Sequence, residues 1–259
     1  MYQTTRPGPT ILAAMLLALA GCGGGGDSDN AGTAGPTPSS PKAEGVYAGT
    51  TSTGYELSLL VLENDVAWGM YTWNYQGSDY LVGFVQGPGV SKNGSFSIAD
   101  GRDYHFLNDI TYKVTASGTY VPGVSIQGSV TDGSTALSFT ATTAAVIGYD
   151  YRQPATLSAV AGTWSGFYSA GWETGTVSVS ATGAVSGATS SGCIYGGTVA
   201  PRASGKNVYD VSITFGPSPC ALPGQSATGI AVITSGGKQL LVAATTASRA
   251  YGATFVGQR

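Results

Sequence analysis

Apolar and polar residues alternate along most of the chain after residue 44. Alternation with a period of two is typical of β-strands that have one buried face and one solvent-facing side. It is clearest at residues 124–130, 137–140, 177–180 and 211–215. Residues 57–62 are more continuously apolar, which predicts a strand buried on both faces. Helical periodicity is almost absent after the first 20 residues, so the pattern predicts an all-β protein.

Short turn signals separate these runs. Asn-Gly and Asp-Gly pairs readily adopt the positive φ values that tight hairpins require. Turns are therefore predicted at Asn64-Asp65, Asn93-Gly94, Asp100-Gly101, Asp132-Gly133, Thr182-Gly183 and Gly236-Gly237. Closely spaced hairpins favour antiparallel meanders, in the form of sandwiches or up-and-down barrels. Closure into a barrel also removes exposed strand edges, which are prone to aggregation.

The alternating region consists of two similar halves. Residues 45–50 (GVYAGT) resemble residues 162–166 (GTWSG), since both place an aromatic residue between two glycines. Residues 83–93 align without gaps to residues 197–207, and a strand is predicted after each. Residues 139–144 (FTATTA) also resemble residues 242–247 (VAATTA). We therefore predict a tandem repeat.

The repeat divides the chain into two β-modules, residues 44–148 and 159–259. A linker is predicted at residues 149–158, where the alternation lapses and Pro154 disfavours strand pairing. The second module divides into about eight strands, a common number for small closed barrels. The opening aromatic residue of each module resembles the one on the first strand of lipocalin-type and avidin-type barrels, which implies that it closes one barrel end. We predict two tandem antiparallel meander modules, each a small barrel; the alternative is one larger sandwich built by both halves.

The first 43 residues follow a different pattern. Arg6 is the only charged residue before Asp27, and residues 11–20 are continuously apolar. This run is too short for a transmembrane helix, which needs about 20 apolar residues. Residues 1–21 are therefore predicted to be a signal peptide. Residues 22–43 are rich in Gly, Ser and Pro and lack an apolar pattern, which predicts a disordered tether.

The end of the predicted signal peptide, Leu19-Ala20-Gly21-Cys22, resembles the bacterial lipobox. The resemblance implies cleavage before Cys22 and attachment of lipid to its sulfur, and several acyl chains anchor a protein stably to a membrane. Enterobacterial lipoproteins kept in the inner membrane carry aspartate after this cysteine, whereas this chain has Gly23. The expected location is the outer membrane, on either its periplasmic or its cell-surface face.

Cys193 and Cys220 are the two cysteines that remain once Cys22 is lipidated. In an oxidising compartment an even pair predicts a disulfide. Closing a loop of about 28 residues stabilises the fold by roughly 3.6 kcal/mol in the chain-entropy model. Metal binding is a poor alternative because the chain has a single histidine, His105. No metal site and no cofactor are predicted.

No catalytic group stands out among the polar residues. His105 has Asp109 nearby, but with many serines and a single histidine a Ser-His-Asp triad can always be proposed, so this signal has no weight. His105 is predicted to lie on a loop or rim. Glu63 and Asp65 flank a predicted turn and are expected to be solvated there. Removing Arg6 from the 11 Lys and Arg leaves 10 against 14 Asp and Glu, a net charge of −4, which argues against nucleic-acid binding. The chain is predicted not to be an enzyme.

An aromatic segment is the strongest candidate for a contact surface. On one strand Tyr71, Trp73 and Tyr75 would share a face, with Tyr80 following, while Trp68 and Met70 would share the other. Tyr and Trp offer rigid contact area with a polar tip, which suits protein or carbohydrate partners. The alternative is that one face fills a barrel and the other packs against the second module.

Two classes of function remain. The lipid anchor, Gly-rich tether and tandem β-modules resemble, in layout, surface lipoproteins of the factor-H-binding and transferrin-binding types. Three segments, VAPRASGKN from Val199, SPCALPGQ from Ser218 and SRAYG from Ser248, resemble motifs of a family of proteobacterial envelope lipoproteins, which implies no particular activity. The expected function is a non-catalytic binding or surface-interaction lipoprotein. The alternatives are an envelope enzyme inhibitor of the lysozyme-inhibitor type and, less favoured, an enzyme.

Overall fold

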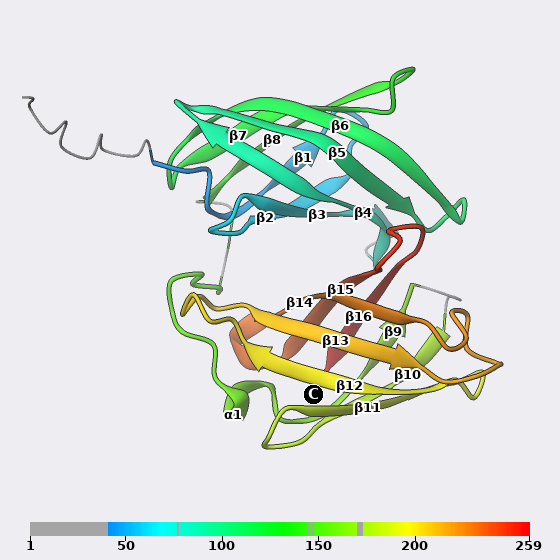
Figure 1. Cartoon of the computed structure of the whole chain (residues 1–259). Coiled ribbons are helices and arrows are strands. Elements are labelled where there is room, and N and C mark those ends of the chain that lie inside the picture. The colour runs from blue at the N-terminus through cyan, green and yellow to red at the C-terminus, as the bar shows by residue number, and fades with distance from the viewer. Residues whose placement is uncertain (1–40, 77, 144–145, 147, 170–172) are drawn as a thin grey trace, which may run out of the picture. The chain divides into compact units, whose positions relative to one another are not determined.

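The computed structural model describes residues 41–259 except 77, 144–145, 147 and 170–172 (Figure 1). The predicted signal peptide, Cys22 and most of the predicted tether lie outside these residues. The first eight strands are β1 (Gly45–Thr51), β2 (Glu56–Val61), β3 (Val66–Tyr75), β4 (Ser78–Lys92), β5 (Ser95–His105), β6 (Ile110–Val121), β7 (Ser125–Thr131) and β8 (Ala136–Thr142). The other eight are β9 (Gly162–Tyr168), β10 (Glu173–Val179), β11 (Ala184–Thr189), β12 (Ile194–Pro201), β13 (Tyr209–Phe215), β14 (Ser226–Thr234), β15 (Gln239–Thr246) and β16 (Gly252–Gln258). Two short helical turns, α1 (Leu157–Val160) and η2 (Ser235–Gly237), complete the described secondary structure.

The strands form two closed antiparallel barrels, which we call barrel 1 (β1–β8) and barrel 2 (β9–β16). In each barrel every strand pairs with the next along the chain, and the last strand pairs with the first. The prediction of two eight-stranded meander barrels is therefore confirmed. The alternative of one joint sandwich is wrong, because each sheet closes on itself and leaves no edge to share.

The two barrels begin in the same way. Tyr47 on β1 and Trp164 on β9 are both fully buried. Tyr47 donates a hydrogen bond from its hydroxyl to the carbonyl of Ala43 (2.9 Å), and Trp164 donates one from its indole N–H to the carbonyl of Val160 (2.9 Å). Each aromatic residue thus ties the chain four residues before it against the barrel, and the GxYxG and GxWxG segments have equivalent structures.

The second glycine of each segment allows the barrel to close. A Cβ atom at Gly49 would lie 1.9 Å from the carbonyl oxygen of Thr140 on β8, and one at Gly166 would lie 2.0 Å from that of Val256 on β16. Real Cβ atoms never approach this closely. Only glycine therefore permits the first strand to meet the last strand at this spacing.

The tandem repeat is confirmed in two of its further segments and wrong in one. Residues 83–92 lie on β4, and residues 197–201 lie on β12, each the fourth strand of its barrel. The strands that follow, β5 and β13, also correspond. Residues 139–142 lie on the eighth strand of barrel 1, however, whereas residues 242–246 lie on the seventh strand of barrel 2. Runs of Ala and Thr suit any strand, so this match reflects composition rather than position.

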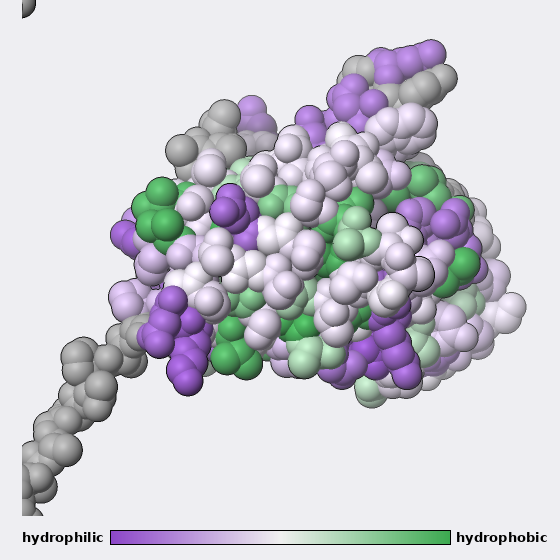
Figure 2. Space-filling view, turned by 90° about the horizontal axis from the view of Figure 1, so that it is seen from above, coloured by the Kyte–Doolittle hydropathy of each residue, from purple (hydrophilic) through white to green (hydrophobic). Residues whose placement is uncertain are grey.

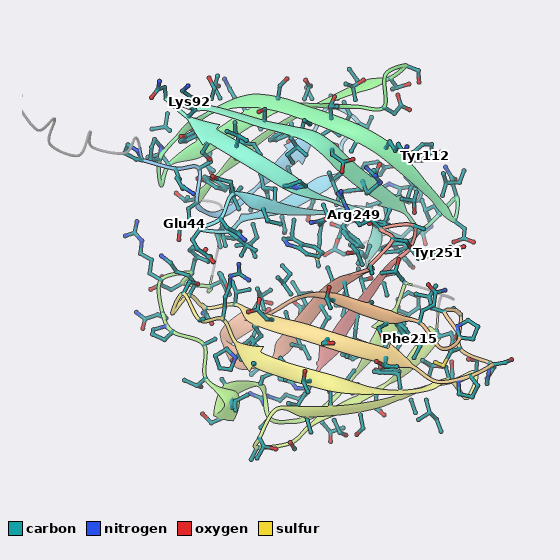
Figure 3. All side chains as sticks on the ribbon, in the orientation of Figure 1. Glu44, Lys92, Tyr112, Phe215, Arg249 and Tyr251 are labelled. Atoms are coloured by element: carbon teal, nitrogen blue, oxygen red, sulfur yellow. A yellow bond between two sulfur atoms is a disulfide. The ribbon has the colours of Figure 1, made fainter. Side chains whose placement is uncertain are left out.

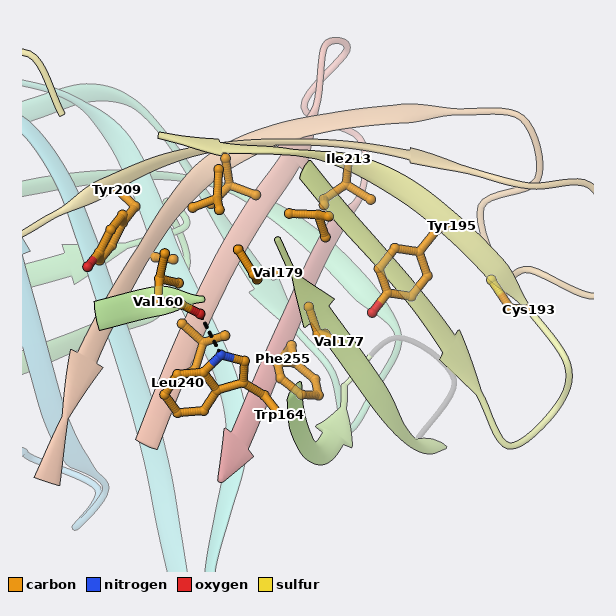
Figure 4. Packing of buried hydrophobic residues seen from close by; sticks show 14 of the residues in the cluster. Val160, Trp164, Val177, Val179, Cys193, Tyr195, Tyr209, Ile213, Leu240 and Phe255 are labelled. Atoms are coloured by element: carbon orange, nitrogen blue, oxygen red, sulfur yellow. Dashed lines mark hydrogen bonds between the residues drawn. The ribbon is translucent and has the colours of Figure 1, made fainter. Parts of the chain in front are cut away.

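Apolar side chains fill barrel 2 (Figure 4). Val177, Val179, Leu240 and Phe255 surround Trp164. Helix α1 covers this end, where the Arg259 guanidinium stacks 4.3 Å from the Trp164 ring centre and donates hydrogen bonds to the carbonyls of α1 and its flank. In barrel 1 the segment before β1 covers the corresponding end of the barrel.

Residues 41–43, which belong to the predicted tether, contact barrel 1. Ala43 is fully buried, and Tyr120 donates a hydrogen bond to the carbonyl of Pro41 (2.7 Å). Lys42 forms an ion pair with Asp65 (3.0 Å). Asp65 has a positive φ of 64° in the turn after β2, as its pair with Asn64 predicts, but its carboxylate is mostly buried rather than solvated.

A further apolar cluster joins the outer faces of the two barrels. Barrel 1 contributes Leu60, Leu62, Trp68, Phe84 and Tyr104, the connecting segment contributes Tyr151, and barrel 2 contributes Val208, Ile230 and Ala243. Leu59 and Val61 point into barrel 1, so burial on both faces is confirmed for residues 59–62. It is wrong for the start of the predicted range, because Ser58 is exposed. Glu63 also pairs with Arg202 of barrel 2 (2.9 Å) instead of standing free in solvent.

The hairpin between β15 and β16 forms polar contacts with barrel 1. Arg249, which is labelled in Figure 3, belongs to this hairpin. It donates hydrogen bonds to the Asp100 carboxylate (2.8 Å) and to the backbone carbonyls of Asp100 and Gln86. Tyr104 in turn donates a hydrogen bond to the carbonyl of Arg249 (3.2 Å). This arginine therefore links barrel 2 to β4 and β5 of barrel 1.

Charged residues are sparse on the surface, as the 10% content of charged residues requires. On the face shown in Figure 2, hydrophilic residues form small separate groups among residues of near-neutral hydropathy.

The disulfide between Cys193 and Cys220 is present in barrel 2, as the cysteine count predicts, and both half-cystines are buried.

Candidate functional site

Barrel 1 contains a cavity of about 260 Å³. Most of its wall is aliphatic or aromatic, and the exposed residues Asp132 and Thr135 belong to its lining, so it reaches solvent between β7 and β8. The lining comprises Thr51, Tyr55, Leu57, Leu59, Ala67, Gly69, Tyr71, Val85, Phe96, Ile98, Asp103, His105, Tyr112, Val114, Ala116, Val130, Thr131, Asp132, Thr135, Leu137 and Phe139. An apolar cavity with a few grouped polar side chains is the usual form of a small-molecule site.

A β-bulge in β5 directs polar residues into this cavity. The register of β5 shifts between Ile98 and Arg102 against β4, and between Ile98 and Gly101 against β6. Such a bulge adds one residue and reverses which side chains face inward. Before the bulge Phe96 and Ile98 line the cavity, and after it Asp103 and His105 do. The predicted turn at Asp100-Gly101 is therefore wrong, because these residues form the bulge within a continuous strand.

The bulge also places Tyr104 on the outside of barrel 1. Tyr104 is buried in the cluster between the barrels, where its ring lies 4.6 Å from that of Phe84. Arg249 holds the outer side of the bulge through its bonds to Asp100. The β-bulge thus directs Asp103 into the cavity on one face of β5 and places Tyr104 in contact with barrel 2 on the other.

Tyr71, Asp103 and His105 form the polar group of the cavity wall. The Tyr71 hydroxyl donates a hydrogen bond to Oδ1 of Asp103 (2.6 Å), and its ring centre lies 6.2 Å from that of His105. Gly83, opposite Tyr71 on β4, leaves room for the tyrosine, because a Cβ atom there would lie 2.3 Å from the hydroxyl. Nδ1 of His105 is buried and has no hydrogen-bond partner among the described residues.

Burial dominates the electrostatics of this group. It raises the pKa of Asp103, and the hydrogen bond from Tyr71 and the nearby His105 offset this only in part. Burial also raises the pKa of Tyr71, with the Asp103 charge as the next cause. Tyr71 therefore stays protonated and remains a donor to the carboxylate at neutral pH.

The interior of barrel 2 is nearly full in comparison. Its cavity measures about 80 Å³. Tyr168 and Tyr195 meet through their hydroxyls inside the barrel, and the Phe255 ring lies 4.7 Å from that of Tyr168. Leu222, buried next to the disulfide, is part of the lining. Of the two barrels, barrel 1 therefore offers the space for a ligand.

The structure separates the aromatic residues that the sequence grouped together. Tyr71 lies in the cavity wall, whereas Trp73 on β3 and Tyr80 on β4 pair across strands and are each 45% exposed. Tyr75 ends β3, and its side chain lies outside the described residues. Trp68 and Met70, on the opposite face, pack against barrel 2.

His105 lies at the end of a strand and lines the cavity, rather than on a loop. Asp109 is in the turn after β5, with a φ of 51°, and is exposed. The residue that sequence reasoning missed is Asp103. Its spacing of two from His105 on a strand was the available signal, since that spacing places both side chains on one face.

The described part of the chain contains no group of three or more His, Cys, Asp or Glu residues suited to a metal ion. Within the same residues, no helix has the length and apolar character needed to cross a membrane.

No model of a known protein family matches the chain, and no curated protein sequence shows significant similarity to it. Among solved structures, the isotype 1 transferrin binding protein B from serogroup B Neisseria meningitidis is similar, with 9% sequence identity and a TM-score of 0.30. The match covers 80% of this chain and 64% of that one, so this chain spans less than two thirds of that protein's length. A similarity of this size does not extend to a ligand or a partner.

Proposed function

We propose that this protein is a non-catalytic envelope lipoprotein whose barrel 1 binds a small, mostly apolar molecule. The observation that carries the proposal is the cavity of about 260 Å³ in barrel 1, open to solvent and polar at one part of its wall. A cavity of about 150 Å³ accommodates a benzene ring. A ligand of roughly ten non-hydrogen atoms therefore suits barrel 1.

Gly69 provides a direct way to block the cavity. It lines the cavity on β3, and a Cβ atom there would lie 3.6 Å from Leu57 and Leu59, which is ordinary contact. Gly69→Leu should therefore fill the space without breaking the strand. Gly196 on β12 is a matched control, because a Cβ atom there would also have an ordinary contact, 3.5 Å from Val185, and Gly196 does not line the barrel 2 cavity.

The binding test is a titration with octan-1-ol, followed by NMR shifts of backbone amides in β3, β5 and β6. Saturable shifts in the unaltered protein and in Gly196→Leu, with at least a tenfold loss of affinity in Gly69→Leu, are expected. Equal binding by Gly69→Leu would place the ligand elsewhere. If the unaltered protein bound neither octan-1-ol nor its charged eight-carbon analogues, the proposal would be overturned.

The lipid anchor is supported by the sequence alone, through the resemblance of Leu19-Ala20-Gly21-Cys22 to the lipobox. Cys193 and Cys220 pair with each other, which leaves Cys22 as the odd cysteine of an exported protein. Growth with labelled palmitate tests the anchor in whole cells. Label on the unaltered protein and none on Cys22→Ala are expected, while equal labelling of the two would contradict lipidation at this residue.

The exposed pair of Trp73 and Tyr80 stays a predicted contact for a protein or carbohydrate partner. Both are on the β3–β4 hairpin, at the same end of barrel 1 as the β7–β8 turn where the cavity opens. A partner bound there would contact the mouth of the cavity. Protease treatment of intact cells tests whether this end is available outside the cell, because a periplasmic domain survives until the outer membrane is broken.

A further inference from the structure

The cavity in barrel 1 is acidic and aromatic. Among the described residues that line it are two carboxylates, Asp103 and Asp132, and three tyrosines, but no lysine or arginine. His105 is the one basic side chain among the described lining residues. The arginines near this part of β5 face the other way, since Arg102 pairs with Asp100 on the outside of the barrel.

Asp103 lies at the centre of this arrangement. It pairs across strands with Val85 on β4 and Tyr112 on β6, and directly paired residues point to the same side of a sheet. Tyr71 reaches it from β3 with a hydrogen bond to Oδ1. Asp103 is largely withdrawn from water, and among the described residues no lysine or arginine forms an ion pair with it. A buried carboxylate without a cation is unfavourable unless a positive group compensates it.

The tyrosine rings near Asp103 provide a second attraction for a positive group. The Tyr55 and Tyr71 rings lie 5.7 Å apart, and Tyr112 flanks Asp103 from the other side. The faces of aromatic rings attract cations electrostatically. Below this group the wall is formed by Leu, Ile, Val and Phe side chains, which suit an apolar body.

We propose that barrel 1 binds an apolar amine, with its ammonium group against Asp103 and the tyrosines and its hydrocarbon part among the apolar side chains. This inference rests on the proposed binding function and specifies the chemical class of its ligand. A carboxylate of the same shape would meet Asp103 and Asp132 as like charges, and a neutral alcohol would leave Asp103 without a counter-charge.

The test compares octylamine, octan-1-ol and octanoate, which share a chain length and differ in charge, in calorimetric titrations at pH 7. An alkylamine is fully protonated there, as a lysine side chain is. Octylamine should bind at least tenfold more tightly than octan-1-ol, and octanoate should bind more weakly than both. Equal affinity for octylamine and octan-1-ol would overturn the amine proposal and leave cavity binding intact, whereas no binding of any of the three would overturn both.

Asp103→Asn tests the role of the carboxylate, because it keeps the side-chain shape and removes the charge. The preference for octylamine over octan-1-ol should fall below threefold. Glu173→Gln is the matched control, since Glu173 lines the barrel 2 cavity, and it should leave the preference unchanged. A preference that survives in Asp103→Asn would contradict the assignment. If that variant does not fold, the comparison of the three ligands on the unaltered protein decides the proposal by itself.

Discussion

Tyr47 and Trp164 occupy equivalent positions in the two halves of the chain. Each is fully buried at the closed end of its barrel and donates one hydrogen bond to a carbonyl four residues earlier. The residues differ in what else they contact, because Trp164 also stacks against Arg259. Substitutions at these two positions therefore compare the loss of the Tyr47 hydrogen bond with the loss of the Trp164 hydrogen bond together with its contact to Arg259.

Tyr47→Phe should lower the free energy of unfolding by about 1 kcal/mol, because it removes one buried hydrogen bond and leaves the carbonyl of Ala43 without this partner. Trp164→Phe should cost more, since it also reduces packing and the contact with Arg259. Urea unfolding measures both changes. Tyr80→Phe, at an exposed tyrosine, serves as the control, and a Tyr47→Phe effect no larger than this control would contradict the role of the hydroxyl.

Asp103 should make the stability of the protein depend on pH in an unusual direction. Burial raises its folded-state pKa above the ordinary value of 3.8, so the folded protein takes up a proton at a higher pH than the unfolded chain does. The stability from this proton is fully present below about pH 3.8 and is lost as pH rises through the folded-state pKa. Relative to Asp103→Asn, the unaltered protein should therefore gain stability as the pH falls from 7 toward 4.

Asp132 should have the opposite effect on how the stability of the protein depends on pH, because its pKa is lowered rather than raised. Backbone hydrogen bonds from Thr135 and Ser134 lower the pKa of this exposed carboxylate. Its stabilising contribution is present above the unfolded-state pKa and is lost as pH falls through the folded-state pKa. Urea unfolding between pH 3 and 7 should thus show opposite trends for Asp103→Asn and Asp132→Asn, and parallel trends would refute the assigned environments.

Single strands and turns followed closely from the hydrophobic pattern, whereas the bulge in β5 did not. About eight strands were predicted for the second module, and barrel 2 has eight. Asp100-Gly101 has the composition of a turn, yet it lies within β5, where Arg249 from barrel 2 holds it. That contact joins residues far apart in the chain, so local composition could not reveal it. The spacing of Asp103 and His105 places both on one face of the strand, but only the bulge makes that face the inner one.

Closure of each barrel depends on one glycine in its first strand. Gly49→Ala should prevent normal pairing of β1 with β8, because its Cβ would lie 1.9 Å from the carbonyl oxygen of Thr140. We expect a loss of at least 2 kcal/mol, of the order of the larger single-site effects known for folded proteins. Gly69→Ala on β3, where a Cβ has ordinary contacts, should change stability by less than half of this amount. Equal urea midpoints for the two variants would show that the strands can separate without cost.

The two barrels share the apolar cluster between them, which predicts that they unfold as one cooperative unit. If barrel 2 unfolds, barrel 1 exposes Leu60, Trp68 and Phe84 to water, among others. Exposing one large apolar side chain costs about 1.5–3 kcal/mol. The loss of several together approaches the whole stability of a typical domain, which is about 5–15 kcal/mol. The stability of barrel 1 should therefore depend on the integrity of barrel 2.

The disulfide in barrel 2 provides the test of this coupling. Replacing Cys193 and Cys220 by serine frees the loop of barrel 2 and should lower its free energy of unfolding by about 2–5 kcal/mol. Because the apolar cluster joins the barrels, the most protected amides of β1–β8 should lose protection by a similar free energy, although no residue of barrel 1 is changed. Hydrogen exchange with mass spectrometry, read separately for the two barrels, measures this. A loss confined to β9–β16 would mean that barrel 1 is stable alone, and that the cluster between the barrels contributes little to its stability.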